Sequence, residues 1–407
     1  MWTRHPYNHA IVSEANAASV AWSGRGPSDF LPGELRSLED LLTRADREVR
    51  LLGALTPREA YAERARLVGA LGRRQPLVPR WTYEARSHAD LRRSLECADR
   101  WLAHRADPLA STYQARLREL ALEAAICEAA GTRALAALAR SRFAGANPES
   151  EAAAAEACRR WLSEKGLEPS KRRILSDSPD ALSLVSLIRA AVGAARLPFA
   201  VVPSSPLAAL AATGDDVILV ATGRLVLEED ARRTAIHEVE GHARPRHCAR
   251  SAALAIFRVG TARGVDDQEG RAVLLEQRAG LLGTRRRRQL ATRHWAVLAM
   301  GDGASFGDVA RALVDDHGLE APDAVVVAER VFRGSDGRAP GLGRERIYLD
   351  AFVRMQSWLA LHPEDERVLA SGQVGIDSVE TLRPWTPHTP IALCETFNET
   401  LEPTRRP

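Results

Sequence analysis

The sequence predicts an α+β protein that is mostly helical and carries one small sheet. Residues 32–166 place Ala, Leu, Arg and Glu at spacings of three and four with few β-branched residues, as amphipathic helices do. Two short β-rich runs lie within residues 197–222. Helical periodicity then returns up to about residue 361, so the sheet falls between two helical stretches.

The composition is that of a soluble globular protein. Of the 407 residues, 45% are hydrophobic and 27% are charged. Lys plus Arg is 56 and Asp plus Glu is 53, and the net charge of +3 does not predict nucleic acid as the main partner. Four consecutive arginines at residues 285–288 form the one local basic block. We expect them on the polar face of a solvated helix, with a docking patch for an acidic partner as the alternative.

Cysteine usage and the N-terminal residues bear on location. The five cysteines are widely spaced and include no CxxC pair, which argues against a disulfide framework and against a cysteine-based zinc site. His5, His9 and Glu14 interrupt the stretch where a secretory signal would be apolar. No window approaches the roughly 18 apolar residues that span a bilayer. We therefore expect a cytoplasmic protein with no membrane partner.

We divide the chain into an N-terminal extension (1–31), a helical subdomain (32–175), a core that contains the sheet (176–385) and a C-terminal tail (386–407).

Two helices are marked by their end signals. Thr56, Pro57 and Glu59 supply an N-cap, a first-turn proline and a capping-box acid for a helix that ends near Gly72. Residues 305–317 predict a second helix, which Gly318 closes.

The segment QPLVPRWTY, residues 75–83, breaks the helical periodicity of the first half. Pro76 and Pro79 disfavour a helix there. Trp81 and Tyr83 bring aromatic surface to the segment. We expect a loop packed on the core or over a cleft, so that Tyr83 either lines a binding site or anchors its own loop.

The runs LPFAVVP and DVILVAT, residues 197–203 and 216–222, are the clearest strands. Residues 216–221 are our candidate for an exposed edge strand along which a peptide lies, with an ordinary core strand as the alternative. Three acidic residues at 228–230 then mark the positive end of a helix that runs into His237.

That helix carries the segment TAIHEVEGHARP, in which His237 and His242 flank Glu238. Two neutral histidine nitrogens and an adjacent carboxylate base suit a zinc site that hydrolyses a substrate. The histidines are five residues apart, which at about 100° per residue separates them by roughly 140° on a regular helix. A one-residue π-bulge would bring them together, and Gly241 supplies backbone freedom there. Two unrelated surface histidines are the alternative.

A catalytic zinc site needs a third protein ligand. His247 follows Pro245 too closely to share the helix. Asp266, Asp267, Glu269 and Glu276 are the acidic candidates downstream. Glu269 stands near the head of a second helix over residues 266–280, and an antiparallel helix can present such a carboxylate to the histidines.

The sequence from Arg258 to Leu282, RVGTARGVDDQEGRAVLLEQRAGLL, resembles the signature of the QEGLA-motif family, also labelled flavohemoglobin expression-modulating proteins. That family includes the microtubule-associated tyrosine carboxypeptidases. Further similarity lies in DGASFGDVARALVDDHGL from Asp302, ERVFRG from Glu329 and IYLDAF from Ile347. The resemblance covers roughly residues 32–361, and an HExxxH helix followed by QEG at this distance is a specific signal.

The resemblance implies a zincin-like metallopeptidase with one Zn²⁺ per chain, and residues 176–385 would be its catalytic core. His237 and His242 would be zinc ligands, and Glu269 the third. Glu238 would be the general base that activates a zinc-bound water.

The sequence departs from the family's pattern in three motifs. The family's usual GTH before the second histidine is here Glu240, Gly241 and His242, and its Leu after QEG is Arg271. Its Lys-Asp pair is here Arg344 and Glu345. The expected ligands and base are intact, so the departures bear on substrate preference.

Three further side chains are candidates for substrate contact. Arg330 and Arg333 flank Phe332, and a guanidinium can bind a C-terminal carboxylate bidentately. Tyr348 can donate to the oxyanion of the reaction. A structural ion pair for either arginine and a core position for the tyrosine are the alternatives.

We therefore expect a metallocarboxypeptidase that removes C-terminal residues from peptides or proteins. The alternatives are an aminopeptidase of the HExxxH type and a non-catalytic zinc-binding regulatory protein.

Overall fold

The computed structural model describes residues 28–165, 172–205, 207 and 209–387. The expected C-terminal tail and most of the expected N-terminal extension lie outside these residues, as does Cys394. The four described cysteines are free thiols. The division of the chain into units stays a prediction. No helix of the described residues is long and apolar enough to cross a membrane.

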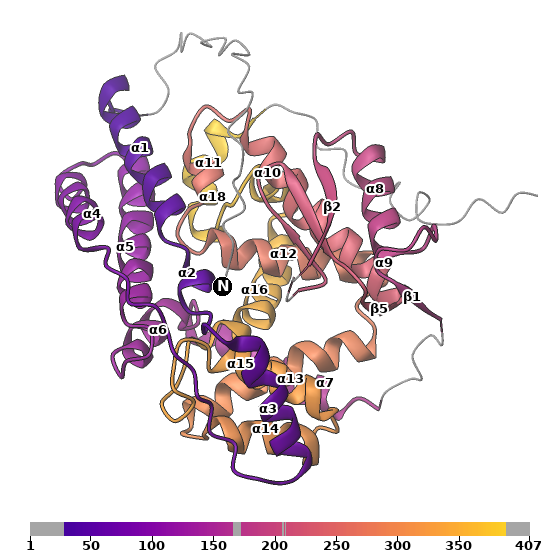
Figure 1. The fold of residues 1–407 in the computed structure, drawn as a ribbon. Coiled ribbons are helices and arrows are strands. Elements are labelled where there is room, and N and C mark those ends of the chain that lie inside the picture. The colour runs from indigo at the N-terminus through magenta and orange to yellow at the C-terminus, as the bar shows by residue number, and fades with distance from the viewer. Residues whose placement is uncertain (1–27, 166–171, 206, 208, 388–407) are drawn as a thin grey trace, which may run out of the picture.

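The first half forms a run of helices, as the periodicity predicts (Figure 1). These helices are α1 (Pro32–Glu48), α2 (Leu51–Ala54), α3 (Ala60–Gly72), α4 (Ala89–Leu102), α5 (Pro108–Glu128), α6 (Leu135–Phe143) and α7 (Pro148–Ser163). Their buried apolar residues recur at helical spacing, as Leu38, Leu42 and Ala45 do in α1. The loop at residues 75–83 packs on the core through Leu77, which is 5% exposed.

Helix α3 ends at Gly72 as expected, but the expected start at Thr56 is wrong. The helix begins at Ala60, and its N-cap position makes no side-chain hydrogen bond. The Thr56 hydroxyl donates instead to the Leu52 carbonyl of α2, 2.7 Å away. Because that hydroxyl is already engaged with the preceding turn, it does not cap the next helix.

The small sheet has three strands in the order β2-β4-β3. Strand β2 (Ala200–Ser204) pairs parallel with β4 (Val217–Ala221), and β3 (Ala211–Thr213) pairs antiparallel with β4. A separate antiparallel ribbon joins β1 (Arg173–Leu175) to β5 (Leu225–Leu227).

The candidate edge strand is wrong, because β4 lies in the centre of the sheet. Ile218 and Val220 are fully buried, and strands lie on both sides of them. The outer strands are β2 and β3, and β3 is the one that contacts the histidine-bearing helix.

The second half returns to helices, with Gly318 in the left-handed conformation after α14, as expected. The helices outside the histidine segment are α8 (Leu184–Ala194), α11 (Ile256–Val259), α12 (Gly264–Arg278), α13 (Thr284–Gly301), α14 (Phe306–Asp315), α15 (Ala321–Val331), α16 (Ile347–Leu361), α17 (Glu366–Leu369) and α18 (Val379–Leu382). Short 3-10 turns are η2 (Arg344–Arg346), η3 (Pro363–Asp365), η4 (Ile376–Ser378) and η5 (Arg383–Trp385).

Helices α12 and α16 form the most extensive helix pair, and both lie near the middle of the molecule (Figure 1). The glycine of the QEG element, Gly270, makes their approach close. A Cβ at Gly270 would lie 2.3 Å from the Ala351 carbonyl carbon, so no larger residue fits without moving α16.

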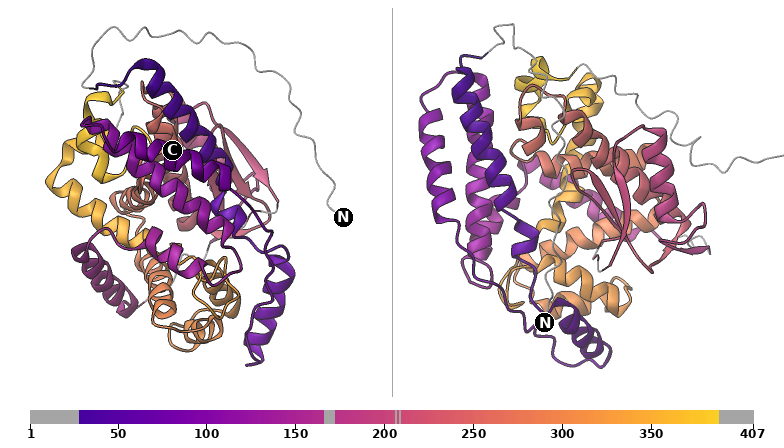
Figure 2. Two further views of the ribbon diagram at one scale, coloured as in Figure 1. Left: turned by 90° about the vertical axis from the view of Figure 1, so that its left-hand side faces the viewer. Right: turned by 45° about the horizontal axis from the view of Figure 1, so that its top comes forward.

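Two apolar cores meet at α12. One joins α1, α4, α5 and α7 to α12, α13 and α16, and the other joins α8, the three-stranded sheet and α9 (Glu228–Ile236). In Figure 1, α12 lies between the helices α1, α4 and α5 on the left and the sheet on the right, and the right-hand view of Figure 2 shows the same separation of these helices from the sheet. Helix α12 therefore presents one side to each core.

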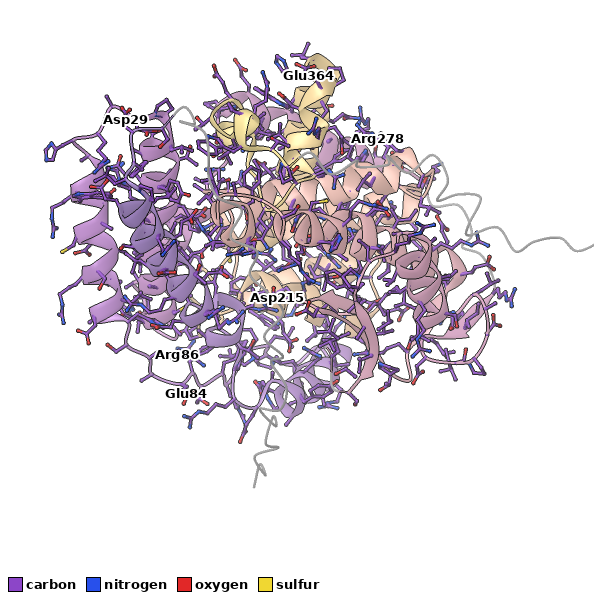
Figure 3. The ribbon with its side chains drawn as sticks, turned by 90° about the horizontal axis from the view of Figure 1, so that it is seen from above. Asp29, Glu84, Arg86, Asp215, Arg278 and Glu364 are labelled. Carbon is purple, nitrogen blue, oxygen red and sulfur yellow. The ribbon has the colours of Figure 1, made fainter. Side chains whose placement is uncertain are left out.

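The arginines at residues 285–288 form a solvated face only in part, because Arg286 is buried and the other three are half-buried. Arg286 is 7% exposed and forms two hydrogen bonds with the Glu276 carboxylate. Arg285 pairs with Asp230, and Arg287 with Glu164. All three of these arginines are thus engaged in ion pairs, whereas charged residues such as Glu364 and Asp215 are exposed (Figure 3).

Candidate metal centre

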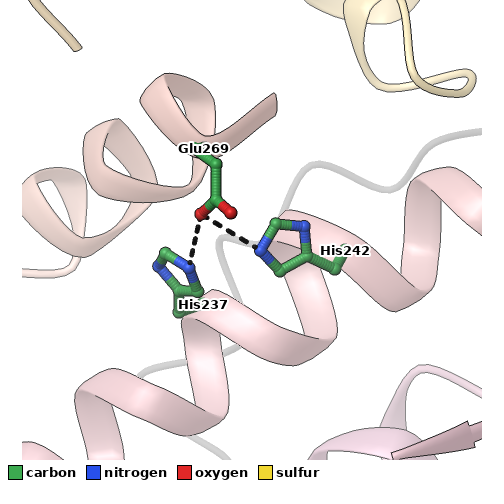
Figure 4. A group of neighbouring side chains, drawn as sticks. All are labelled: His237, His242 and Glu269. Carbon is green, nitrogen blue, oxygen red and sulfur yellow. Dashed lines mark ion pairs between the residues drawn. The ribbon is translucent and has the colours of Figure 1, made fainter. Parts of the chain in front are cut away.

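The histidine segment is one continuous helical rod with a π-helical middle. Helix α9 (Glu228–Ile236) passes into the π-helix η1 (His237–Ala243) and then into α10 (Arg244–Ala249). The predicted π-bulge is confirmed. It places the rings of His237 and His242 with their centroids 4.9 Å apart on one side of the rod (Figure 4).

Pro245 explains why the π-turn lies here. Proline has no N–H to donate to the preceding turn. The Arg244 N–H bonds to the Val239 carbonyl, five residues back, which leaves the Glu240 carbonyl without a helical donor. The Arg271 side chain supplies that donor from α12, with Nη1 3.1 Å from the Glu240 oxygen. Arg271, which departs from the family pattern, thus stabilises the π-turn.

Gly241 matters for packing as well as for backbone freedom. A Cβ at this position would lie 2.6 Å from the Cβ of Ala272 on α12. The bare backbone therefore lets α12 approach η1 closely enough to bring its carboxylates to the histidines.

Three donor atoms converge between η1 and α12. Glu269 Oε2 lies 3.3 Å from His237 Nε2 and 3.6 Å from His242 Nε2 (Figure 4). The three residues form one of the groups whose ligand atoms lie within 4.8 Å of one another. The structure thus brings together the three residues that the resemblance named as ligands.

The other ligand candidates lie elsewhere or are engaged. Pro245 does not end the helical rod: α10 continues through His247, contrary to the expectation, and Arg271 supplies the donor that proline lacks. His247 does not belong to the converging group. The carboxylate of Asp266 pairs with Arg142, and the Asp267 carboxylate pairs with Arg354.

Glu276 stands behind His237. Its Oε1 lies 2.8 Å from His237 Nδ1, and Arg286 holds the same carboxylate in a bidentate pair. Glu276 is fully buried. Sequence reasoning weighed Glu276 as a ligand and did not find this supporting position, although its spacing of seven residues from Glu269 puts both on one face of α12.

The second histidine is held in the same manner. His242 Nδ1 lies 3.0 Å from Gln268 Oε1. With the Nδ1 atoms of both rings bonded to side chains of α12, both Nε2 atoms face Glu269. Such partners fix the ring orientation and the tautomer of a metal-binding histidine.

Electrostatics of the metal-free group follow from this arrangement. Burial alone would lower the pKa of His237, but hydrogen bonds to Glu269 and Glu276 raise it to about 9. Burial opposes ionisation of Glu269 as well, yet its bonds to the two histidines hold its pKa well below the usual range. In the metal-free group these hydrogen bonds therefore favour a positive charge on His237, next to Glu269.

Glu238 lies next to this group in the π-helix and is 8% exposed. The hydroxyl of Thr213, on strand β3, donates to Glu238 Oε2 at 2.7 Å. Nothing in the sequence drew attention to Thr213, because the contact joins two segments 25 residues apart.

On the other side of Glu269 lies a basic group, formed by Arg293, Arg330, Arg333 and Arg344. Arg344 Nη2 lies 3.3 Å from Glu269 Oε1.

Glu345 is the carboxylate that this basic group surrounds. Its Oε1 lies 2.9 Å from Arg330 Nε, and its Oε2 lies 3.7 Å from Arg293. No carboxylate of the described residues pairs with Arg333. Burial and the charge of Arg330 lower the pKa of Arg333, and the same two causes lower that of Arg293 to about 10. The four guanidiniums repel one another, so the group favours an added anion.

Residues 72–391 match the family model described as microtubule-associated tyrosine carboxypeptidase. This range spans most of the chain and contains every element of the candidate centre. The chain belongs to this family. The predicted relationship to these carboxypeptidases is confirmed, and membership indicates a carboxypeptidase-type hydrolase that acts on a peptide or protein. No curated protein shows significant similarity to the chain.

Two candidate residues of this family member lie beside the basic group. Tyr348, on α16, lies with its ring 5.9 Å from the guanidiniums of Arg293 and Arg344. Burial and the nearby charge of Glu269 raise the pKa of Tyr348, so its hydroxyl keeps its proton near neutral pH. The Tyr83 hydroxyl donates to the Ser335 carbonyl at 2.9 Å, which anchors the loop of residues 75–83.

A second group that could hold a cation is formed by His362, Glu364 and Asp365. Asp365 already accepts hydrogen bonds from Trp358 and Arg383. Because its oxygens are engaged and its charge is neutralised, this group is the weaker candidate.

Proposed function

We propose that this family member is a zinc-dependent carboxypeptidase with a zincin-like site, which removes C-terminal residues from peptides or proteins. The observation that carries the proposal is the convergence of His237 Nε2, His242 Nε2 and Glu269 Oε2 at the π-helix that also carries Glu238.

The donor set fits zinc. Two imidazoles and one carboxylate form the ligand set of several catalytic zinc sites, and such sites keep a fourth position open. Ligand atoms about 2.0–2.1 Å from a tetrahedral zinc lie roughly 3.3 Å from one another. The observed separations from Glu269 Oε2, 3.3 and 3.6 Å, are close to that value. The site therefore needs little rearrangement to accept the ion.

Zinc, when bound at such a site, polarises the scissile carbonyl and makes water more acidic. Glu238 then takes a proton from the attacking water and delivers it to the leaving amine. Its low exposure keeps bulk water from competing for that proton. Tyr348, which stays protonated, donates a hydrogen bond to the oxygen that becomes negative in the transition state.

The basic group would bind the substrate's terminal carboxylate. Among the described residues, these four arginines form ion pairs with two carboxylates, Glu269 and Glu345, so one anion can enter without displacing an existing ion pair. Arg333 is the best candidate because it has no carboxylate partner among the described residues, whereas Arg330 is engaged by Glu345. An aminopeptidase would instead need acidic residues here to hold an ammonium group. The charge of this group thus favours a carboxypeptidase.

Mass spectrometry of peptide-library digests tests the proposal. The zinc-loaded protein and its Glu238→Gln variant are each given peptides with free or amidated C-termini. We expect the wild type to trim free C-termini and to leave amidated peptides intact, since amidation removes the charge that pairs with guanidinium. Glu238→Gln should keep its zinc and lose at least about 100-fold in turnover, because an amide cannot accept the proton.

Three results would contradict the proposal. Equal cleavage of free and amidated peptides would rule out recognition of the terminal carboxylate. Turnover of Glu238→Gln within tenfold of wild type would rule out the base. A zinc-loaded wild type that cleaves nothing in the library would favour the non-catalytic, regulatory alternative.

A further inference from the structure

Glu238 needs a defined orientation to act as a base. Three side-chain torsions separate its carboxylate from the backbone, and a misplacement of about 1 Å at a reacting group can cost 100-fold in rate. Among the described residues, Thr213 is the one side chain that bonds to this carboxylate. The bond is 2.7 Å long, which is the usual distance for a hydroxyl that donates to an oxygen.

Thr213 is itself held firmly. It is the last residue of β3 and stands opposite Ile218, a fully buried residue of the central strand. The turn that follows is closed by a 2.7 Å bond from the Gly214 N–H to the Val217 carbonyl. The Thr213 hydroxyl oxygen also lies 3.2 Å from the Glu238 main-chain oxygen, so it contacts both ends of that residue.

The main chain of Thr213 faces away from the sheet. Leu210 and Gly214 bond to β4, and in an antiparallel pair such residues alternate with residues whose N–H and C=O point outward. Ala211 and Thr213 are the outward residues. No strand of the described residues covers this edge. A peptide that lies along β3 can therefore bond to the main chain of Thr213 while its side chain still holds Glu238.

We propose that Thr213 is the positioning residue of the general base. Its hydroxyl fixes Glu238 Oε2 and thereby leaves Oε1 to take the proton from water. The proposal rests on the proposed peptidase function. The hydroxyl acts on the base, so its loss should lower kcat. The main chain of residue 213, which would bind the peptide, is the same in every variant, so KM should not change.

Steady-state hydrolysis of a free-acid peptide by the zinc-loaded protein tests this role. Thr213→Val keeps the shape and removes the hydroxyl, and Thr213→Ser keeps the hydroxyl. Thr292→Val is the matched control, because Thr292 is 4% exposed and its hydroxyl donates to the Arg288 carbonyl within α13. Zinc content and melting temperature are measured for all variants.

We expect Thr213→Val to lower kcat by about 10- to 100-fold, with KM within about twofold of wild type and one zinc per chain. Thr213→Ser should restore kcat to within about threefold, and Thr292→Val should leave it unchanged. A Thr213→Val enzyme with kcat within twofold of wild type overturns the proposal, as does a Ser variant as slow as the Val variant. A zinc-loaded wild type without activity overturns both this role and the proposed function. If the wild type is active, the proposed function stands and the variants test the role of Thr213 alone.

Discussion

At the scale of single residues, the candidate centre depends on side chains that hydrogen-bond to the candidate metal ligands. Glu276 orients His237, and Gln268 orients His242. Arg286 keeps Glu276 ionised despite complete burial, and the pKa of Glu276 is lowered accordingly, in opposition to the effect of burial. Each of these residues is polar and buried, which is costly unless it is paired. Their hydrogen bonds to one another and to the two imidazoles offset this cost.

The substrate side of the centre yields a prediction for Arg333. Arg333→Ala should raise KM for a free-acid peptide by about 30-fold or more, which corresponds to the loss of about 2 kcal/mol when one partner of a desolvated charge pair is removed. Zinc content should not change, because Arg333 contacts no ligand. Kinetics with free-acid peptides and metal analysis provide the measurements.

Arg338→Ala is the control for Arg333→Ala, since Arg338 is exposed in the same loop. It should behave as wild type. A KM for Arg333→Ala within twofold of wild type would exclude this arginine from the binding of the terminal carboxylate. Arg330→Ala is unsuitable for the comparison, because it leaves Glu345 buried without its nearest partner.

At the scale of secondary-structure elements, the π-turn and helix α12 depend on each other. Pro245 removes a backbone donor, Arg271 replaces it, and Gly241 lets the two elements touch. Arg271 is also bonded to Glu366 at 2.8 Å, which ties the turn to α17. The spacing of the two histidines is usable only because these contacts stabilise a π-turn that an isolated helix would not keep.

Gly241→Ala tests the close approach of η1 and α12. The added Cβ would lie 2.6 Å from Ala272 Cβ, so the two elements must separate. We expect the variant to lose about 1–3 kcal/mol in the free energy of unfolding, as overpacked cores do, and to bind zinc more weakly. Denaturant unfolding and a zinc competition assay measure the two effects.

Gly193→Ala is the control for the glycine substitution. Gly193 lies in α8 with no atom within 4 Å of an added Cβ, so alanine there should be neutral or stabilise by up to about 1 kcal/mol. Unchanged zinc affinity in Gly241→Ala would show that the site does not depend on this contact.

At the scale of the whole molecule, the candidate centre lies where the two apolar cores meet. Val239 of η1 belongs to the core of the sheet, whereas Val273 and Leu274 of α12 belong to the core of the N-terminal helices. A cation held by His237 and Glu269 would therefore tie one core to the other.

This position predicts that zinc stabilises the fold. At a free zinc concentration 1,000 times the dissociation constant, the gain in unfolding free energy should be about 4 kcal/mol. Melting curves with zinc and with a chelator measure it. Glu269→Ala should melt at one temperature in both conditions, because it lacks the third ligand. Identical melting of the wild type with and without zinc would contradict metal binding at this position.

The sequence by itself determined the elements and the candidate ligands. Periodicity predicted the helices of both halves, and residue spacing predicted the π-turn between His237 and His242. The QEG element indicated the family and directed attention to Glu269. These signals are local, because each depends on residues that are close in the chain, and a motif keeps its spacing whatever packs around it.

Only the tertiary structure decided which residues support the site and which strand lies open beside it. Residues 216–221 read as an edge strand but lie in the centre of the sheet. Arg286 reads as part of a solvated block but pairs with the buried carboxylate of Glu276. Strand order depends on which segments pair across the chain, and the burial of a charge depends on a partner far away in sequence. The contact of Thr213 with Glu238 is of the same kind, because it exists only once β3 has been placed against η1.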